Sequence, residues 1–264
     1  MIDPNGFYPS DLIDLFKYGQ MLLHGEYFPR YPLPAVGLFA LLSLIPIQVA
    51  YILIVALSLL ALVNLFKRRA VWCALYAPIG QCLIQGQVDV LCLWMLLRAS
   101  PVSLALLTLK PQLFLFALPV LLKRRELWKP FVLWTVLLWG VPTLIYPQWI
   151  GQWLAGSNDG RLNGTSSSLW PVPMFALALI VYMVITRRYD WRVIASSLNP
   201  LLRAYDYTML AGASLWLIPL SWLCVVLMWQ IGAAWPMALV SLPLLVNPHV
   251  TDIGCSVECR DASV

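Results

Sequence analysis

Side chains that can carry chemistry interrupt an otherwise apolar stretch of the chain between residues 77 and 112. This stretch contains the turns G-Q-V-D (Gly86–Asp89) and L-K-P-Q (Leu109–Gln112). In a membrane-spanning helix, a central Lys or Asp costs roughly 2.5–3.5 kcal/mol on insertion scales. Polar residues retained at such positions commonly bind a ligand. The candidate substrate-binding residues here are Gln85, Gln87, Asp89, Lys110 and Gln112.

The alternative for each of these residues is structural. An ordinary connecting loop explains any single glutamine equally well. Lys110 can extend its amine to the membrane interface. Asp89 can pair with Lys110 or with Arg203, because a buried acid is stable when it is paired.

The composition indicates a polytopic integral membrane protein of the all-α class. Of the 264 residues, 61% are apolar and 11% are charged, whereas soluble domains average about 25% charged residues. The net charge of +5 therefore reports on membrane topology. No nucleic-acid partner is expected, since such a partner would need a basic surface facing solvent.

The apolar residues form about 9–11 segments, several of them short or broken by proline. At 1.5 Å per residue, a helix of 10–13 residues covers roughly half of a 30 Å hydrocarbon core. The short segments therefore cannot each cross the membrane alone. The segments lie at roughly 33–45, 47–66, 70–84, 88–97, 101–109, 112–122, 128–147, 171–186, 192–202, 207–229 and 231–246.

Three regions follow from this pattern. Residues 1–31 are predicted to be an extracytoplasmic amphipathic arm, with a helix between Ser10 and Gly25 lying on a membrane face; a solvated arm is the alternative. Residues 32–250 are the predicted transmembrane helical domain. Residues 251–264 lose their apolar character and are expected to form an irregular tail.

Basic clusters predict the orientation. Lys67–Arg69, Lys123–Arg125 and Arg187–Arg188 are assigned to the cytoplasm by the positive-inside rule. Alternation then places the arm and both polar turns on the extracytoplasmic side, with the turns near mid-depth. Irregular backbone at that depth must be buried in protein or line a wet cavity. We therefore expect a multi-pass protein of the plasma (inner) membrane, with a polar cavity open to the outside.

The groups assigned to this cavity suit a phosphate that carries an apolar tail. Lys110 or Arg203 would neutralise the phosphate. A carboxylate, from Asp11 or Asp14 in the arm or from Asp89 or Asp206, would accept the proton of an attacking hydroxyl or stabilise the positive charge that develops at a sugar carbon. Tyr205 and Asp206 complete the predicted set of substrate-binding residues. No ligand spacing requires a metal, so no cofactor is predicted, although the carboxylates are numerous enough for a divalent ion.

Three pieces of the sequence resemble glycosyltransferase family 87. They are G-Q-x-D (Gly86–Asp89), L-K-P-Q (Leu109–Gln112) and the opening D-L-I-D-L-F-K-Y-G-Q-M-L-L-H-G-E-Y (Asp11–Tyr27), followed later by N-P-L-L-R-A-Y-D-Y (Asn199–Tyr207). The resemblance implies a GT-C-like helical bundle that moves a mannose-like hexose from a polyprenyl-phosphate carrier to a glycan or glycolipid acceptor. It also implies Asp11 as the essential catalytic aspartate of the first extracytoplasmic loop, with Asp14 as its rival.

Two features depart from that family. Its members carry a transmembrane helix before the first loop, and further helices after the position of His249. Neither is present between residues 1 and 264. We therefore expect a fragment of a longer protein, whose activity in this form is open.

Two other functions fit the same residues. Broken helices at mid-depth are also typical of transporters and lipid flippases, although the sequence shows no internal repeat. A non-catalytic membrane partner of a larger enzyme is the third hypothesis.

Overall fold

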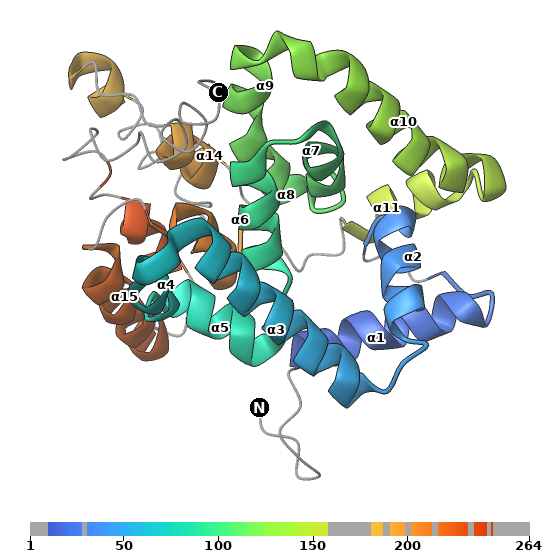
Figure 1. Ribbon diagram of the computed structural model, residues 1–264, viewed down its shortest axis with the longest axis horizontal. Coiled ribbons are helices and arrows are strands. Elements are labelled where there is room, and N and C mark those ends of the chain that lie inside the picture. Colours follow the sequence, from blue (N-terminus) through green and yellow to red (C-terminus); the bar gives the residue numbers. More distant parts are fainter. Residues whose placement is uncertain are drawn as a thin grey trace, which may run out of the picture. The chain divides into compact units, whose positions relative to one another are not determined.

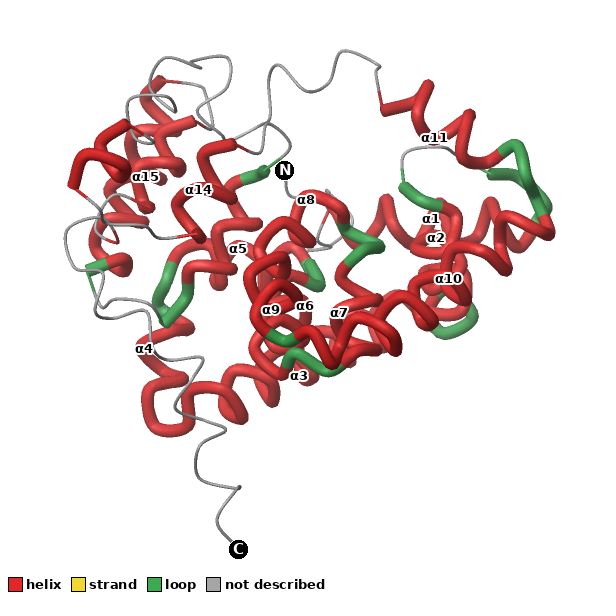
Figure 2. The backbone as a smooth tube through the Cα atoms, turned by 90° about the horizontal axis from the view of Figure 1, so that it is seen from above, coloured by secondary structure: helices red, strands yellow, loops and turns green. Residues whose placement is uncertain are grey.

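The computed structural model describes residues 10–27, 31–157, 181–186, 191–198, 202–212, 216–231, 235–241 and 244. These residues form helices and their connections, with no strand among them (Figures 1 and 2). The predicted all-α class is confirmed. The chain divides into two compact units, Met1–Ala61 with Gln81–Arg161, and Leu62–Gly80 with Leu162–Val264.

The elements in chain order are α1 (Ser10–Leu23), α2 (Leu33–Leu42), α3 (Ile47–Phe66), η1 (Lys67–Arg69), α4 (Ala70–Ala74), α5 (Ala77–Gln85), α6 (Asp89–Arg98), α7 (Pro101–Leu107), α8 (Pro111–Phe114), η2 (Leu115–Ala117), α9 (Leu118–Lys123), η3 (Arg125–Leu127), α10 (Trp128–Ile145) and α11 (Trp149–Ser157). They continue with α14 (Trp191–Leu198), η4 (Ala204–Leu210), α15 (Leu217–Ile231) and η5 (Trp235–Ser241).

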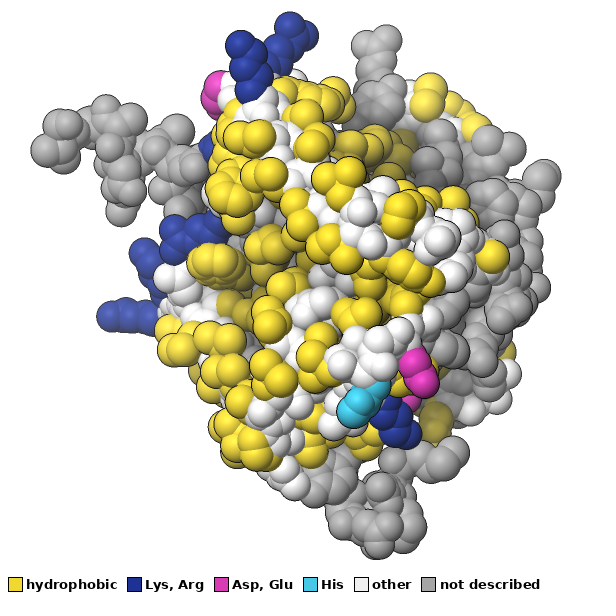
Figure 3. All heavy atoms as spheres, turned by 90° about the vertical axis from the view of Figure 1, so that its right-hand side faces the viewer, with side chains coloured by type: hydrophobic (Ala, Val, Ile, Leu, Met, Phe, Trp, Pro, Cys, Tyr) yellow, Lys and Arg dark blue, Asp and Glu magenta, His cyan; other side chains and the backbone are white. Residues whose placement is uncertain are grey.

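Two helical stretches in the described chain are long and apolar enough to cross a membrane. They are Ile47–Ala74, which contains α3, and Arg125–Ile145, which contains α10. A bent pair, α5 with α6, passes the same test together but turns through 120° at its break. Hydrophobic side chains cover much of the coloured surface in Figure 3, as expected where a protein faces lipid. Membrane association therefore has a structural basis.

Helix α1 confirms the predicted helix of the N-terminal arm. It buries Leu12, Leu15 and Phe16 and packs against α2. Gly19 makes this close approach possible, because a Cβ at that position would lie 2.5 Å from the carbonyl oxygen of Phe39. The helix ends before Gly25, whose φ of +83° is readily adopted by glycine.

Helix α10 packs on α7 and, further along, on α2 (Figure 1). Trp128 fixes the start of α10, since its indole N–H donates to the carbonyl of Leu121 at 2.8 Å. In the middle of α10, the indole N–H of Trp139 donates to the hydroxyl of Thr108 at 2.8 Å. Trp139 also contacts Trp149 of α11, with 5.5 Å between ring centroids.

In the second unit, hydrogen bonds join the segment before Gly80 to residues far along the chain. The hydroxyl of Tyr76 donates to the carbonyl of Tyr207 at 2.9 Å. The hydroxyl of Ser221 accepts from the backbone N–H of Ala77 at 3.1 Å. Helices α14 and α15 and the 3₁₀ segments η4 and η5 pack together in this unit.

Two of the predicted apolar segments are divided in the structure. The segment 70–84 separates into α4 and α5. Pro78 lies in the first turn of α5, where its missing N–H is not needed, whereas one continuous helix would place its ring against the carbonyl of residue 74. The segment 207–229 separates into η4 and α15, with Gly212 at a φ of +78° after η4.

Candidate functional site

The two polar turns predicted from the sequence come together in the first unit. The Nζ of Lys110 lies 2.5 Å from the Oδ1 of Asp89. The Asp89 side chain is fully buried, and 14% of the Lys110 side chain is exposed. A buried charge of this kind is stable when it is paired. The sequence-based alternative in which Asp89 pairs with Lys110 is therefore confirmed.

Helix starts position both charges. Asp89 is the first residue of α6, where the helix dipole favours a negative side chain. Lys110 immediately precedes α8, with Pro111 as the first helical residue. Helices α6 and α7 pack together, and the chain leaves α7 at Leu107, three residues before Lys110. This packing brings the two helix starts within reach of one another.

The turn before Asp89 requires a glycine. Gly86 has a φ of +65°, and a Cβ there would lie 3.1 Å from the Cβ of Leu12 and 3.2 Å from a ring carbon of Tyr51. The backbone N–H of Gln87 donates to the carbonyl of Cys82 at 2.8 Å. The hydroxyl of Tyr51 donates to the carbonyl of Leu83 at 3.1 Å. The turn is thus held by α1, α3 and its own backbone.

Two amide groups in this turn are buried without a hydrogen-bond partner among the described residues. They are the Nε2 of Gln87 and the Oε1 of Gln85, and the Gln87 side chain is only 4% exposed. An unsatisfied buried amide costs about 1–3 kcal/mol. One donor and one acceptor, two and four residues before the Asp89 of the ion pair, would suit a polar ligand that brings its own hydrogen-bonding groups.

The Trp139–Thr108 hydrogen bond gives the depth of this region along α10. Trp139 is the twelfth of the 18 residues of α10, so it lies about 17 Å along a helix about 27 Å long. Lys110 follows Thr108 by two residues. The Lys110 turn therefore begins beside the inner turns of α10, and its predicted depth in a membrane stays a prediction.

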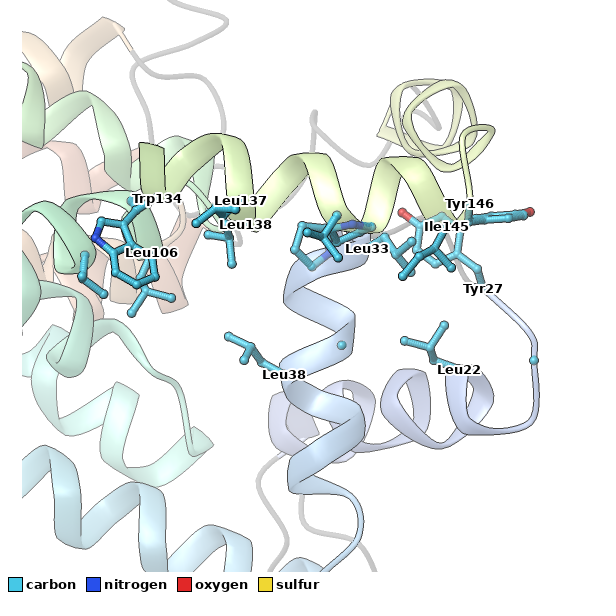
Figure 4. Close-up of a pocket in the computed structure, with 17 residues that line it drawn as sticks. Leu22, Tyr27, Leu33, Leu38, Leu106, Trp134, Leu137, Leu138, Ile145 and Tyr146 are labelled. Carbon is cyan, nitrogen blue, oxygen red and sulfur yellow. The ribbon is translucent and has the colours of Figure 1, made fainter. Parts of the chain in front are cut away.

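An apolar groove of about 690 Å³ lies in the same unit (Figure 4). It is formed by the end of α1, α2, α7 and α10. Tyr27 and Tyr146 lie at one end, and Leu106 and Trp134 lie at the other. Its lining is Leu22, Gly25, Tyr27, Leu33, Pro34, Gly37, Leu38, Val102, Ala105, Leu106, Trp134, Leu137, Leu138, Val141, Pro142, Ile145 and Tyr146.

The tyrosines make one end of this groove more polar than the rest. The hydroxyl of Tyr27 donates to the carbonyl of Tyr31 at 2.7 Å, and its ring meets Tyr146 edge to face at 6.2 Å. Burial raises the pKa of Tyr27, and the nearby Tyr146 raises that pKa further. The apolar remainder of the groove matches a hydrocarbon chain, and the tyrosines form its polar limit at one end.

Arg203, Tyr205 and Asp206 lie together in the second unit. The backbone N–H of Arg203 donates to the Oδ2 of Asp206 at 2.7 Å, and its guanidinium donates to the Tyr205 hydroxyl at 3.2 Å. Asp206 is fully buried and caps η4 in this way. The structure therefore gives these residues a local structural role, and their predicted contact with substrate stays a prediction.

The other predicted residues are positioned as follows. Asp11 lies in α1, but its side chain is outside the described part of the structure. Asp14 on α1 and Gln112 on α8 are half-buried. The predicted tail, 251–264, and residues 1–9 of the arm also lie outside the described residues. In the part of the chain that is described, no three His, Cys, Asp or Glu side chains come close enough to hold a metal ion.

Sequence reasoning missed the groove and its tyrosines. The available signal was the pair of aromatic residues at the ends of elements, Tyr27 after α1 and Tyr146 after α10, because tyrosines often mark the polar limit of an apolar surface. Comparison of the chain with protein-family models, curated proteins and solved structures found no match.

Proposed function

We propose that this protein is a membrane hexosyltransferase, which moves a mannose-like hexose from a polyprenyl-phosphate carrier to a glycan or glycolipid acceptor. The observation that carries the proposal is the buried Asp89–Lys110 pair, together with the Oε1 of Gln85 and the Nε2 of Gln87, which are buried without a hydrogen-bond partner among the described residues. A cation and two amides provide the contacts that a sugar phosphate needs. The resemblance of both turns to glycosyltransferase family 87 agrees with this function.

The reaction assigns a separate task to each group. The acceptor hydroxyl oxygen bonds to the anomeric carbon of the hexose, while the bond from that carbon to the phosphate oxygen breaks. Asp11, or its rival Asp14, takes the hydroxyl proton. Lys110 neutralises the departing polyprenyl phosphate. Gln85 and Gln87 hydrogen-bond the hydroxyls of the hexose.

The apolar groove suits the carrier chain. Its lining is almost entirely hydrocarbon along α2, α7 and α10, so it can shield an isoprenoid chain from water. Helix α7 contributes Val102, Ala105 and Leu106 to the groove and leads directly towards Lys110. A carrier lying along this helix would bring its phosphate towards the ion pair.

The proposed setting is the plasma (inner) membrane, which the chain crosses several times. The two span-length helices and the bent α5–α6 pair support this setting. The basic clusters assign Lys123–Arg125 to the cytoplasm. The polar turns then face the extracytoplasmic side, where the acceptor would bind.

A transfer assay tests the proposal. Purified protein in liposomes is given a radiolabelled polyprenyl-phosphate hexose and a glycolipid acceptor. We expect transfer by the wild type and a loss of at least about 100-fold in Lys110→Met and Asp11→Asn, a range typical for lost electrostatic or acid–base groups. Lys17→Met is the matched control, since Lys17 is exposed on α1. Undiminished transfer by Lys110→Met would refute the assigned role.

The 120° break between α5 and α6 also favours a second function, that of a transporter or lipid flippase. Broken helices at mid-depth bind substrates in alternating-access transporters. The same liposomes distinguish this second function. A lipid-linked sugar that changes leaflet without forming a new glycosidic bond would identify a flippase.

A further inference from the structure

The junction between α9 and α10 exposes a group of cations. Lys123, Arg125 and Lys129 are exposed, and Arg124 is half-buried. Glu126 is the single acidic residue within residues 123–129. Lys and Arg side chains project at the upper end of the surface in Figure 3, the height at which α9 meets α10 in Figure 1. The start of α10 adds the positive end of its helix dipole to these charges.

An aromatic anchor lies within this cluster. Trp128 is 41% exposed, yet its indole N–H is fixed by the carbonyl of Leu121 at 2.8 Å. Its ring meets Phe131 edge to face at 6.4 Å. A tryptophan held in this way beside lysines and arginines is typical of the headgroup layer of a membrane.

An apolar face begins directly after the cations. Lys129, Val132, Leu133 and Val136 follow the i, i+3, i+4, i+7 spacing of one helix face. The three apolar side chains are 46%, 57% and 60% exposed. None of these four residues is among those that line the groove, to which α10 contributes Trp134, Leu137, Leu138 and Val141.

We propose that an anionic phospholipid of the bilayer binds here, with its phosphate at Lys123, Arg125 and Lys129 and its acyl chains along Val132, Leu133 and Val136. Charge complementarity selects the headgroup, and the exposed apolar face accepts the chains. The proposal does not depend on the glycosyltransferase function. Each basic residue near a headgroup contributes about five-fold to the binding of an acidic lipid.

Native mass spectrometry of the full chain tests this site. The protein is released from detergent with equal amounts of phosphatidylglycerol and phosphatidylcholine, and the bound lipids are counted. We expect a preference for phosphatidylglycerol. Lys129→Gln should lower this preference about five-fold, and Arg125→Gln with Lys129→Gln about 25-fold. Lys17→Gln, which removes an exposed lysine from α1, should leave the preference unchanged.

The double variant could lose lipid binding simply because it folds poorly. A variant that strengthens binding tests the proposal without this ambiguity. Glu126→Gln removes the acidic residue of the cluster, so it should raise the preference. Higher salt should weaken that preference, because exposed charges are screened. Equal retention of both lipids by the wild type, or equal losses in Lys129→Gln and Lys17→Gln, would overturn the proposal.

Discussion

The ammonium of Lys110 contacts the carboxylate of Asp89 at 2.5 Å, and this contact joins turns that lie 21 positions apart in the sequence. Both groups are largely withdrawn from solvent. Neither charge is stable alone in such surroundings. The pair therefore has a structural consequence as well as its proposed role in binding phosphate.

Removing one partner should destabilise the protein more than removing both. Asp89→Asn or Lys110→Met alone leaves one buried charge, which typically costs about 3–5 kcal/mol. The double variant Asp89→Asn/Lys110→Met should be more stable than the sum of the single changes predicts. Denaturant unfolding in detergent measures this double-mutant cycle. Additive losses would show that the two side chains are not coupled.

Gln87 should show stability and activity changing in opposite directions. Its Nε2 is buried without a partner among the described residues, so Gln87→Met should stabilise the protein by about 1 kcal/mol. The same change should abolish hexose transfer, because the proposed sugar contact is lost. Gln20→Met, at an exposed position of α1, is the control. A Gln87→Met variant with full transfer activity would remove Gln87 from the site.

Gly86 should tolerate no side chain. Its φ of +65° makes alanine unfavourable by about 1–2 kcal/mol, and the added Cβ would press on Leu12 and Tyr51. Gly80→Ala is the matched control, since Gly80 lies in α5 with open space around its Cβ position. That change should stabilise the helix by about 0.5–1 kcal/mol. Thermal unfolding of both variants checks that Gly86→Ala lowers stability and Gly80→Ala raises it.

Tyr27 should make stability fall at alkaline pH. Burial, followed by Tyr146, raises the pKa of Tyr27 in the folded protein, above the value of about 10 for an unfolded chain. The folded state therefore holds this proton more tightly. Its contribution is complete below pH of about 10 and decreases as the pH rises above that value.

Unfolding of the wild type and Tyr27→Phe between pH 8 and pH 12 measures this contribution. The variant should lose less stability over the alkaline range, because the phenol is absent. At neutral pH, the variant should be less stable to unfolding than the wild type, because it lacks the hydrogen bond to Tyr31. Parallel curves for the two proteins would show that Tyr27 does not titrate differently on folding.

Local signals predicted much of the helical pattern. The segment 47–66 matches α3 at both ends, because Pro46 precedes it and the basic run Lys67–Arg69 follows it. The division at Pro78 was missed, since the proline lies inside an apolar run that otherwise reads as continuous. A proline in the first turn of a helix was the physical signal for a new start.

The candidate site was predictable in its residues but not in its pairing. The residue types marked Asp89 and Lys110, yet the sequence left Arg203 as an equal partner for Asp89. The choice depends on the packing of α6 against α7, which no local pattern encodes. The groove was beyond prediction for the same reason, because residues of α1, α2, α7 and α10 line it together.

The central claim is that the polar turns form a wet site open to the extracytoplasmic side. Gln112→Cys tests it most directly, because Gln112 is half-buried and is separated from Lys110 by one residue. With the native cysteines replaced, intact cells are treated with a membrane-impermeant thiol reagent, and Lys123→Cys serves as the cytoplasmic reference. We predict that Gln112→Cys is labelled from outside and Lys123→Cys only after the cells are opened. Labelling of Gln112→Cys solely from the cytoplasm, or from neither side, would contradict the account.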